Sequence, residues 1–158
     1  MIFSTATVPV NPAGEAKLTR DQLWAGLVLK ARDARMFLPA GACTRCDVVA
    51  EGKGFIVREA VIQGDEITEI VSFVPQTKVS FHQAKSPREG VIVNEILEDD
   101  AGELQLRFYA YLGLVGAAAG SDREREAQAA LDSPDRGYRA ALLSTLARTR
   151  ALAAEGKL

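Results

Sequence analysis

The sequence contains a single histidine, His82, and only two cysteines, Cys43 and Cys46, among its 158 residues. A structural zinc site takes four ligands, mostly cysteine and histidine, so this supply excludes one. Two cysteines three positions apart cannot join distant segments, and no disulfide framework is expected. We therefore expect a protein that holds no metal and no cofactor.

The sequence also lacks an excess of charge of either sign. Its 19 basic and 21 acidic side chains give a formal charge of −2, so no summed positive field attracts nucleic acid. The first residues, MIFSTATVPVNP, have neither the basic nor the apolar segment of a secretory signal. The longest weakly polar run, residues 108–120, is shorter than the roughly 20 residues that span a bilayer. We expect a cytoplasmic protein with no nucleic-acid partner and no membrane span.

Hydrophobic periodicity divides the chain into strands and helices. Residues 1–10 alternate as a strand does, and Thr19 with Gln22 forms a capping-box pattern before a helix over about residues 20–31. A short second helix is predicted over residues 34–38. From residue 42 the period falls to two, and six runs separated by turn residues predict an antiparallel meander. These runs are residues 43–51, 55–63, 67–76, 77–84, 90–98 and 103–112.

The end of the chain returns to helical spacing. Residues 121–133 begin with Ser121 and a capping-box Glu124, which predicts a short or mobile helical segment. Residues 133–156 carry a proline, Pro134, near the start and a glycine at the end, and Asp135 early with Arg148 and Arg150 late suits a helix dipole. The apolar stripe of this helix needs a surface to cover; it consists of Tyr138, Leu142, Leu146 and Leu152. The length suits one domain over residues 1–158.

These elements predict an α+β fold in which a curved antiparallel sheet of about seven strands surrounds one long C-terminal helix, in the order β-α-α-β6-α. The helix is the only element large enough to cover the apolar face of the sheet. With this order, the stretches VNPAGEAKLTRDQLWAGLVLKAR and REAVIQGDEITEIVSF resemble the AtaL-like subfamily of the START and birch-pollen-allergen-like superfamily, also called SRPBCC. The resemblance implies a helix-grip fold with an apolar cavity between sheet and helix. Across the superfamily this cavity binds lipids, sterols, flavonoids or polyketides, and some members cyclise or dehydrate polyketides.

The C-x-x-C at residues 43–46 could be a redox centre or two small strand residues. In a strand, positions i and i+3 point to opposite faces, so the two thiols should not meet. A reactive C-x-x-C instead opens a helix, and none follows here. We expect Cys46 to face inward with Val48 and Ala50, and Gly52 with Gly54 to form a hairpin turn rather than a phosphate loop.

Three charged residues share strand faces with apolar neighbours and are the catalytic candidates: Glu59, Arg58 and Glu95. Arg58 and Glu59 are adjacent, so one of them must point inward. An inward charge would be paired or shifted in pKa, and could anchor a ligand or move protons. The simpler interpretation places any one of them on the solvated convex face, and that alternative stays open.

His82 alternates with Val79 and Phe81 and is expected to point outward. Tyr109 and Tyr111 share a face with Arg107. If the opposite face, which carries Leu106, is inward, the tyrosines lie on the convex side and could form a subunit contact. If it is outward, their hydroxyls point at ligand.

The leading hypothesis is a protein that binds an apolar or amphipathic small molecule, of lipid, polyketide or aromatic type. The expected cavity residues are Trp24, Met36, Phe37, Cys46, Val48, Val57, Phe73, Phe81, Phe108, Leu142 and Leu146. One alternative is an enzyme of the polyketide cyclase or aromatase type, with inward charges and a tyrosine as its acid and base. Another is a protein-interaction module, and a homodimer through the convex face is also left open.

Overall fold

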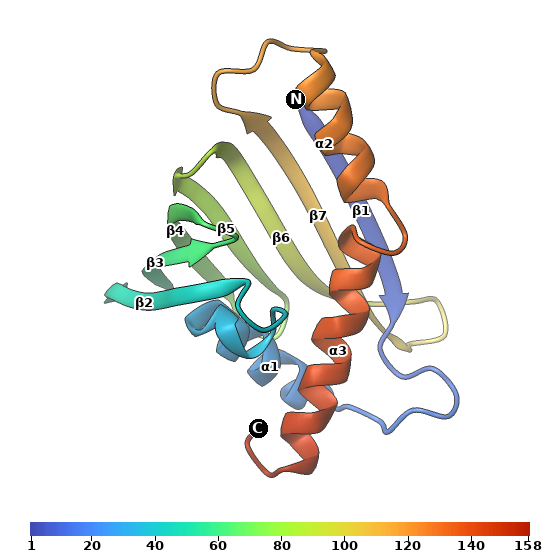
Figure 1. The fold of residues 1–158 in the computed structure, drawn as a ribbon. Helices are drawn as coiled ribbons and strands as arrows, with labels where there is room; N and C mark the ends of the chain where they lie inside the picture. Colours follow the sequence, from blue (N-terminus) through green and yellow to red (C-terminus); the bar gives the residue numbers. More distant parts are fainter.

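The computed structural model describes residues 1–158 as one curved sheet with a long helix lying along its concave side (Figure 1). The strands are antiparallel neighbours in the order β1-β7-β6-β5-β4-β3-β2. Their bounds are β1 Ile2–Pro9, β2 Cys43–Gly52, β3 Phe55–Ile62, β4 Asp65–Val74, β5 Lys78–Lys85, β6 Arg88–Glu98 and β7 Leu104–Leu114. The helical elements are α1 Arg20–Arg32, the 3₁₀ turn η1 Ala34–Met36, α2 Asp122–Asp132 and α3 Tyr138–Ala154. The predicted helix-grip architecture is confirmed.

The predicted six-strand meander is present from β2 to β7. Short turns connect its neighbours, as between Ile62 and Asp65, which are themselves paired across β3 and β4. Gln63 and Gly64 form this two-residue turn with φ values of 53° and 87°, the two positive values that a type I′ turn requires. The first strand, β1, pairs with the last, β7, so the chain brings its two most distant strands together at one edge.

The helix at residues 20–32 starts as the sequence predicts. The Thr19 side chain accepts from the Gln22 amide and the Gln22 side chain accepts from the Thr19 amide, a complete capping box. The second predicted helix, over residues 34–38, is instead the 3₁₀ turn η1. The predicted segment after Ser121 is the helix α2, which lies beside β1 (Figure 1).

The start of the C-terminal helix corrects the prediction. The helix α3 begins at Tyr138 with Gly137 as its cap, so Pro134 and Asp135 lie in the preceding turn. Gly137 closes this turn by donating to the Ser133 carbonyl oxygen at 2.8 Å. The first turn of α3 therefore holds no acidic residue and its last turn no basic one, and the expected dipole complement is absent.

The core lies where α1 and α3 cover the concave face. All four stripe residues of α3 are buried, and Leu142 and Leu152 are completely so. Each fully buried leucine contributes about 2 kcal/mol of hydrophobic stabilisation. The two helices approach closely because α1 has a glycine, Gly26, opposite Thr149: a Cβ at Gly26 would lie 2.7 Å from the threonine side chain. No helix combines the length and the hydropathy that crossing a membrane would require.

Candidate functional site

A cavity of about 190 Å³ lies between the concave face of the sheet and the helical elements. The helical side of its wall comes from the end of α1, from η1 and from the first turn of α3, and strands β3 to β7 supply the rest. Nine of its 16 lining residues are hydrophobic, which makes most of the wall apolar. Among these nine are Ala34, Leu38, Ile62, Ile67, Phe81, Ile92, Phe108 and Tyr138.

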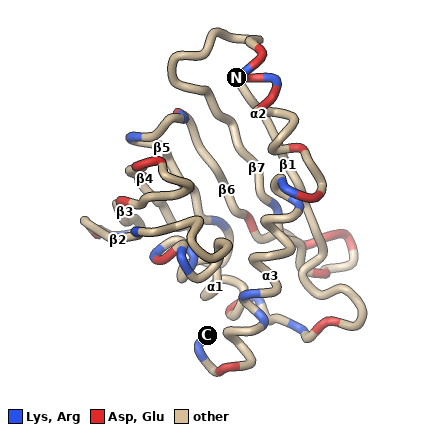
Figure 2. The backbone as a smooth tube through the Cα atoms, in the orientation of Figure 1, with Lys and Arg blue, Asp and Glu red and all other residues tan.

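The polar lining residues are Lys30, Arg58, Asp65, Glu69, Gln83, Arg88 and Asn94. Most of them belong to strands whose other inward residues are aliphatic, so each interrupts an apolar face. Figure 2 shows that acidic and basic residues are otherwise interspersed along the chain rather than collected on one element. The charged groups of the cavity are therefore a local feature of its wall.

A buried ion pair closes one side of the cavity. Arg58 Nε donates to Glu69 Oε2 at 2.6 Å, and Gln83 Nε2 donates to the other carboxylate oxygen at 2.7 Å. Arg58 also donates to the carbonyl oxygens of Lys30 and Ala31 at 3.1 and 2.9 Å. These carbonyls belong to the last turn of α1, whose acceptors would otherwise lack partners. Arg58 thus neutralises Glu69 and attaches the end of α1 to the sheet.

Lys30 lies in the same wall but has no carboxylate partner. Its Nζ is 3.1 Å from Asn94 Oδ1 on β6 and 4.1 Å from the centre of the Phe108 ring on β7. Burial, followed by repulsion from the Arg58 guanidinium, lowers the pKa of Lys30 from 10.5 to about 7, although Glu69 acts in the opposite direction. At neutral pH a large fraction of this amine is therefore uncharged.

Tyr138, the first residue of α3, is the second unusual group of the cavity. Its side chain is buried, and its hydroxyl has no hydrogen-bond partner in the protein. Burial raises the pKa of Tyr138 to about 12, so the phenol keeps its proton at all ordinary pH values. An unpartnered buried donor in a cavity wall is available to a ligand oxygen.

The structure shows which of the three charged candidates point into the cavity and which lie on the convex face of the sheet. Arg58 is buried and inward, whereas its neighbour Glu59 lies on the convex face within 3.9 Å of Arg45. Glu95 is also on the convex face, where it accepts from Arg107 Nε at 3.1 Å. Neither carboxylate lines the cavity, because residues adjacent to the inward Arg58 and Asn94 must point the other way.

The remaining outward predictions agree with the structure. His82 is exposed, and Leu106 is completely buried on the inward face. Tyr109 and Tyr111 therefore lie on the convex side, where the Arg107 guanidinium is 5.3 Å from the Tyr109 ring. Their hydroxyls do not point into the cavity.

Of the expected cavity residues, Phe81 and Phe108 line the observed one. Trp24 and Phe73 instead stack edge to face with ring centres 6.4 Å apart, and Leu142 and Leu146 fill the main core. Val57 points outward beside Arg58, and Val48 packs at the border of the core. Met36 and Phe37 lie in and after η1, outside the lining.

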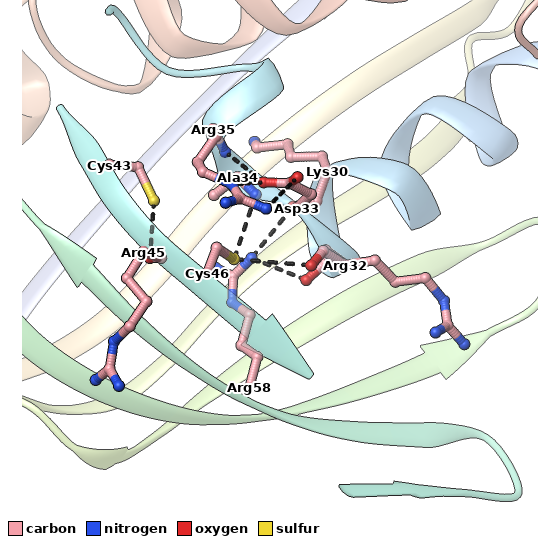
Figure 3. A network of polar contacts seen from close by, with 10 residues as sticks. Lys30, Arg32, Asp33, Ala34, Arg35, Cys43, Arg45, Cys46 and Arg58 are labelled. Atoms are coloured by element: carbon pink, nitrogen blue, oxygen red, sulfur yellow. Dashed lines mark hydrogen bonds and ion pairs between the residues drawn. The ribbon is translucent and has the colours of Figure 1, made fainter. Parts of the chain in front are cut away.

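Both cysteines are buried in one small cluster with Ala34 and Ala60, which corrects the expectation that they occupy opposite faces. A register shift between Cys43 and Arg45 inserts an extra residue in β2, so the simple alternation fails. The Cys46 sulfur lies beneath the junction of α1 and η1, where it accepts from the Ala34 amide at 3.4 Å (Figure 3). A second shift between Val48 and Ala50 leaves Ala50 exposed.

The thiols show no sign of activation. Burial, followed by the proximity of Cys46, raises the pKa of the Cys43 thiol, which disfavours the reactive thiolate. Both cysteines are free. Gly52 and Gly54 belong to the β2–β3 hairpin, as expected, and Gly54 has the positive φ of 82° that a turn glycine supplies.

Sequence reasoning missed Lys30, Glu69 and Gln83, and it treated Tyr138 only as a packing residue. The sequence does contain a pattern that could have identified Lys30 and another that could have identified Glu69. Lys30 follows Leu27 by three positions and Leu23 by seven, which places a lysine on the apolar face of a helix. Glu69 shares its strand face with Ile67 and Val71, which places a carboxylate on an apolar face.

The fold and the family are shown by comparison with known proteins. The aromatase/cyclase Zhui from Streptomyces sp. R1128 is 19% identical with a TM-score of 0.61, over 96% of this chain and 94% of that one. The di-domain aromatase/cyclase StfQ of the steffimycin pathway is 15% identical with a TM-score of 0.63, over 98% of this chain and 51% of that one. The protein Ara h 8.0201 is 10% identical with a TM-score of 0.57, over 98% and 97%.

At these identities the likeness shows the fold alone. None of the curated protein sequences matches the chain. The pattern of the family described as acetylaranotin biosynthesis cluster protein L, however, matches residues 4–156, nearly the whole length. The chain therefore belongs to this AtaL family.

Proposed function

We propose that the protein binds a small, largely apolar molecule that carries a carbonyl or phenol-type oxygen, inside the cavity between the sheet and α3. The observation that supports this function most directly is the composition of the cavity wall. An apolar lining with a few convergent polar groups is the usual form of a small-molecule site. Two of those groups keep hydrogen-bonding capacity for a ligand. The Lys30 amine binds only the neutral Asn94 side chain, and the Tyr138 hydroxyl has no partner in the protein.

The volume of the cavity limits the ligand. A dry cavity of about 150 Å³ accepts a benzene-sized molecule, so about 190 Å³ suits a compact ring with one or two substituents. A longer polyketide or lipid would require side chains of the wall to move. Leu38, which follows η1 in the chain segment before β2, belongs to the least regular part of this wall.

The charges of the cavity favour an oxygen atom over a cation. The lining contains three basic residues and two acidic ones, and one of the acids, Glu69, already accepts from Arg58 and Gln83. A ligand oxygen that accepts hydrogen bonds from Lys30 or Tyr138 would satisfy donors that the protein leaves partly free. At neutral pH, where Lys30 is in large part uncharged, the two other basic residues balance the two acidic ones, so the wall offers a ligand ammonium no excess of negative charge.

Binding can be tested by replacing a cavity-lining residue of one strand with a larger side chain and comparing it with the same replacement on the opposite face. Ile92 on β6 lines the cavity, whereas its neighbour Val91 points to the convex side. In a titration with a fluorescent naphthol, displaced by phenol or benzyl alcohol, we expect Ile92→Phe to weaken binding at least about tenfold. Val91→Phe places the same phenylalanine side chain on the opposite face of the same strand and should bind normally. Equal affinity in both variants, or saturable binding in neither the parent nor Val91→Phe, would reject the cavity as the ligand site.

A second candidate is an enzyme of the polyketide cyclase or aromatase type. Lys30 favours it, because a buried amine with a pKa near 7 is suited to take a proton from a carbon next to a carbonyl. The proteins Zhui and StfQ are described as aromatase/cyclases, which makes this chemistry a reasonable candidate for the shared fold. Exchange of the α-protons of phenylacetone for deuterium, followed by NMR, should be faster with the parent protein than with Lys30→Met. Equal rates would remove Lys30 from such a role.

A further inference from the structure

Lys30 is a half-buried residue of the cavity wall, and no carboxylate binds its amine. Of the two acidic residues in the cavity wall, Glu69 accepts from Arg58 at one oxygen and from Gln83 at the other. Asp65 makes no ion pair with Lys30. The hydrogen bond of Lys30 Nζ goes to Asn94 Oδ1, a neutral acceptor, at 3.1 Å. A structural lysine in a protein interior is normally paired, so this arrangement needs another explanation.

The geometry of the amine suits a reaction at nitrogen. Asn94 is almost completely buried on β6 and fixes the direction of one N–H of Lys30, which leaves the other substituent positions of the nitrogen unoccupied by protein acceptors. The centre of the Phe108 ring lies 4.1 Å from the nitrogen, so one side of the amine contacts an apolar group. Lys30 and Phe108 both line the cavity, so a ligand bound there meets the amine.

We propose that Lys30 forms a reversible covalent imine with aldehyde or ketone ligands that enter the cavity. This inference rests on the proposed function, since it needs the cavity to bind a carbonyl compound, and it names the group that would react with it. It also defines a ligand class, compact aromatic or polyketide-type carbonyl compounds, within the broader class of apolar molecules.

The reaction balances without any oxidant or reductant. The lone pair of the neutral amine attacks the carbonyl carbon, a C–N bond forms, and the C=O π pair moves to oxygen. A proton passes from nitrogen to that oxygen and gives a carbinolamine. The hydroxyl takes up a proton from solvent and leaves as water while the nitrogen lone pair forms the C=N bond, and the resulting iminium returns its N–H proton to solvent to give the neutral imine. Water reverses the same steps and releases the carbonyl compound.

The surroundings of Lys30 favour the first of these steps, attack by the neutral amine. The lowered pKa of Lys30 keeps much of the amine neutral at pH 7, and the neutral amine is the nucleophile. The Arg58 guanidinium opposes protonation of the amine, while Glu69 limits this effect.

Reductive trapping with benzaldehyde and cyanoborohydride tests the proposal, because reduction of the imine leaves a stable benzyl group on the lysine. The protein has five other lysines as internal controls: Lys17, Lys53, Lys78, Lys85 and Lys157. At pH 7.5 and limiting aldehyde, peptide mapping should find Lys30 modified at least about tenfold faster than any of these. Benzyl alcohol, which fits the same site but cannot form an imine, should slow modification of Lys30 and leave the surface lysines unaffected.

Two variants separate the possible outcomes. Lys30→Arg keeps the positive charge and Lys30→Met keeps the length, and both should lose the fast phase, whereas Lys85→Arg on an exposed position should keep it. If benzyl alcohol displaces the naphthol probe but Lys30 is modified no faster than the surface lysines, the imine proposal is overturned and ligand binding stands. If benzyl alcohol also fails to displace the probe, the proposed function fails with it.

Discussion

Arg58 on β3 and Glu69 on β4 are directly opposed in the strand register, and their side chains form an ion pair that is about 5% exposed on each side. The pair lies in the cavity wall beside Lys30 and anchors the last turn of α1. Removing one partner would leave the other charge buried without compensation, which is far more destabilising than losing a surface pair.

Glu69→Gln should therefore lower the free energy of unfolding by about 3 kcal/mol. The amide can still accept one hydrogen bond from Arg58, but it cannot balance the guanidinium charge. Urea denaturation at pH 7.5 measures the change. Glu66→Gln, an exposed position on the same strand, is the matched control and should stay within about 0.5 kcal/mol of the parent. A Glu69→Gln protein as stable as this control would show that the pair contributes no stability.

The stability difference between Lys30→Met and the parent should depend on pH. The folded-state pKa of Lys30, about 7, lies below its ordinary value of 10.5, so the unfolded chain binds more protons between these limits. The stability of the parent consequently gains from this group as pH rises from 7 towards 10.5, while Lys30→Met gains nothing. Relative to the parent, Lys30→Met should be more stable at pH 6 than at pH 10 by about 2 to 4 kcal/mol.

Chemical denaturation at several pH values gives this difference curve directly. The charged and titratable groups around Lys30 are Arg58, Asp65, Glu69, Arg88 and Tyr138, and all are present in both proteins, so their direct contributions largely cancel. Lys85→Met on the exposed part of β5 should give a flat curve. A flat curve for Lys30→Met as well would mean that the amine titrates as it does in water.

Tyr138→Phe should stabilise the empty protein and weaken ligand binding. The Tyr138 hydroxyl is buried without a partner, and an unsatisfied buried polar group costs about 1 to 3 kcal/mol. Phenylalanine keeps the ring and removes this penalty, so the thermal midpoint should rise. Affinity for phenol-type ligands should fall several-fold if their oxygen accepts from this hydroxyl. Tyr109→Phe on the convex side should change neither quantity, and a fall in the midpoint of Tyr138→Phe would indicate a hidden partner for the hydroxyl.

Gly26→Ala should destabilise the protein despite the higher helix propensity of alanine. The new Cβ would lie 2.7 Å from Thr149 Cγ2 and Oγ1, which forces α1 and α3 apart, at a cost of about 1 to 3 kcal/mol. Thr149→Ala removes both atoms. In the Thr149→Ala background the new Cβ still meets the Cβ of position 149 at 3.2 Å, so the Gly26→Ala change should cost less than in the parent, at most about 1 kcal/mol. A double-mutant cycle in urea measures this coupling, and additive effects would show that the two helices do not meet at these residues.

Local patterns in the sequence predict most of the elements. Thr19 and Gln22 define the start of α1 because a capping box involves only neighbouring residues. The Gln63-Gly64 turn is equally local, and alternation along β3 correctly predicts that one of the adjacent residues Arg58 and Glu59 points inward. The predictions fail where an extra residue breaks the alternation, as at Cys43 to Arg45, because a bulge depends on how the neighbouring strand pairs.

The sequence by itself determined the order of strands and helices, the meander and the apolar stripe of α3, since each depends on periodicity and on short-range turn chemistry. Only the tertiary structure decided which strand faces are inward and which polar residues meet across the cavity. Lys30, Glu69 and Tyr138 are 39 and 69 residues apart in the chain, and their common surroundings arise from the curvature of the sheet around the helices. The lowered pKa of Lys30 and the unpartnered hydroxyl of Tyr138 follow from that enclosure, because burial and missing partners are properties of the packed protein.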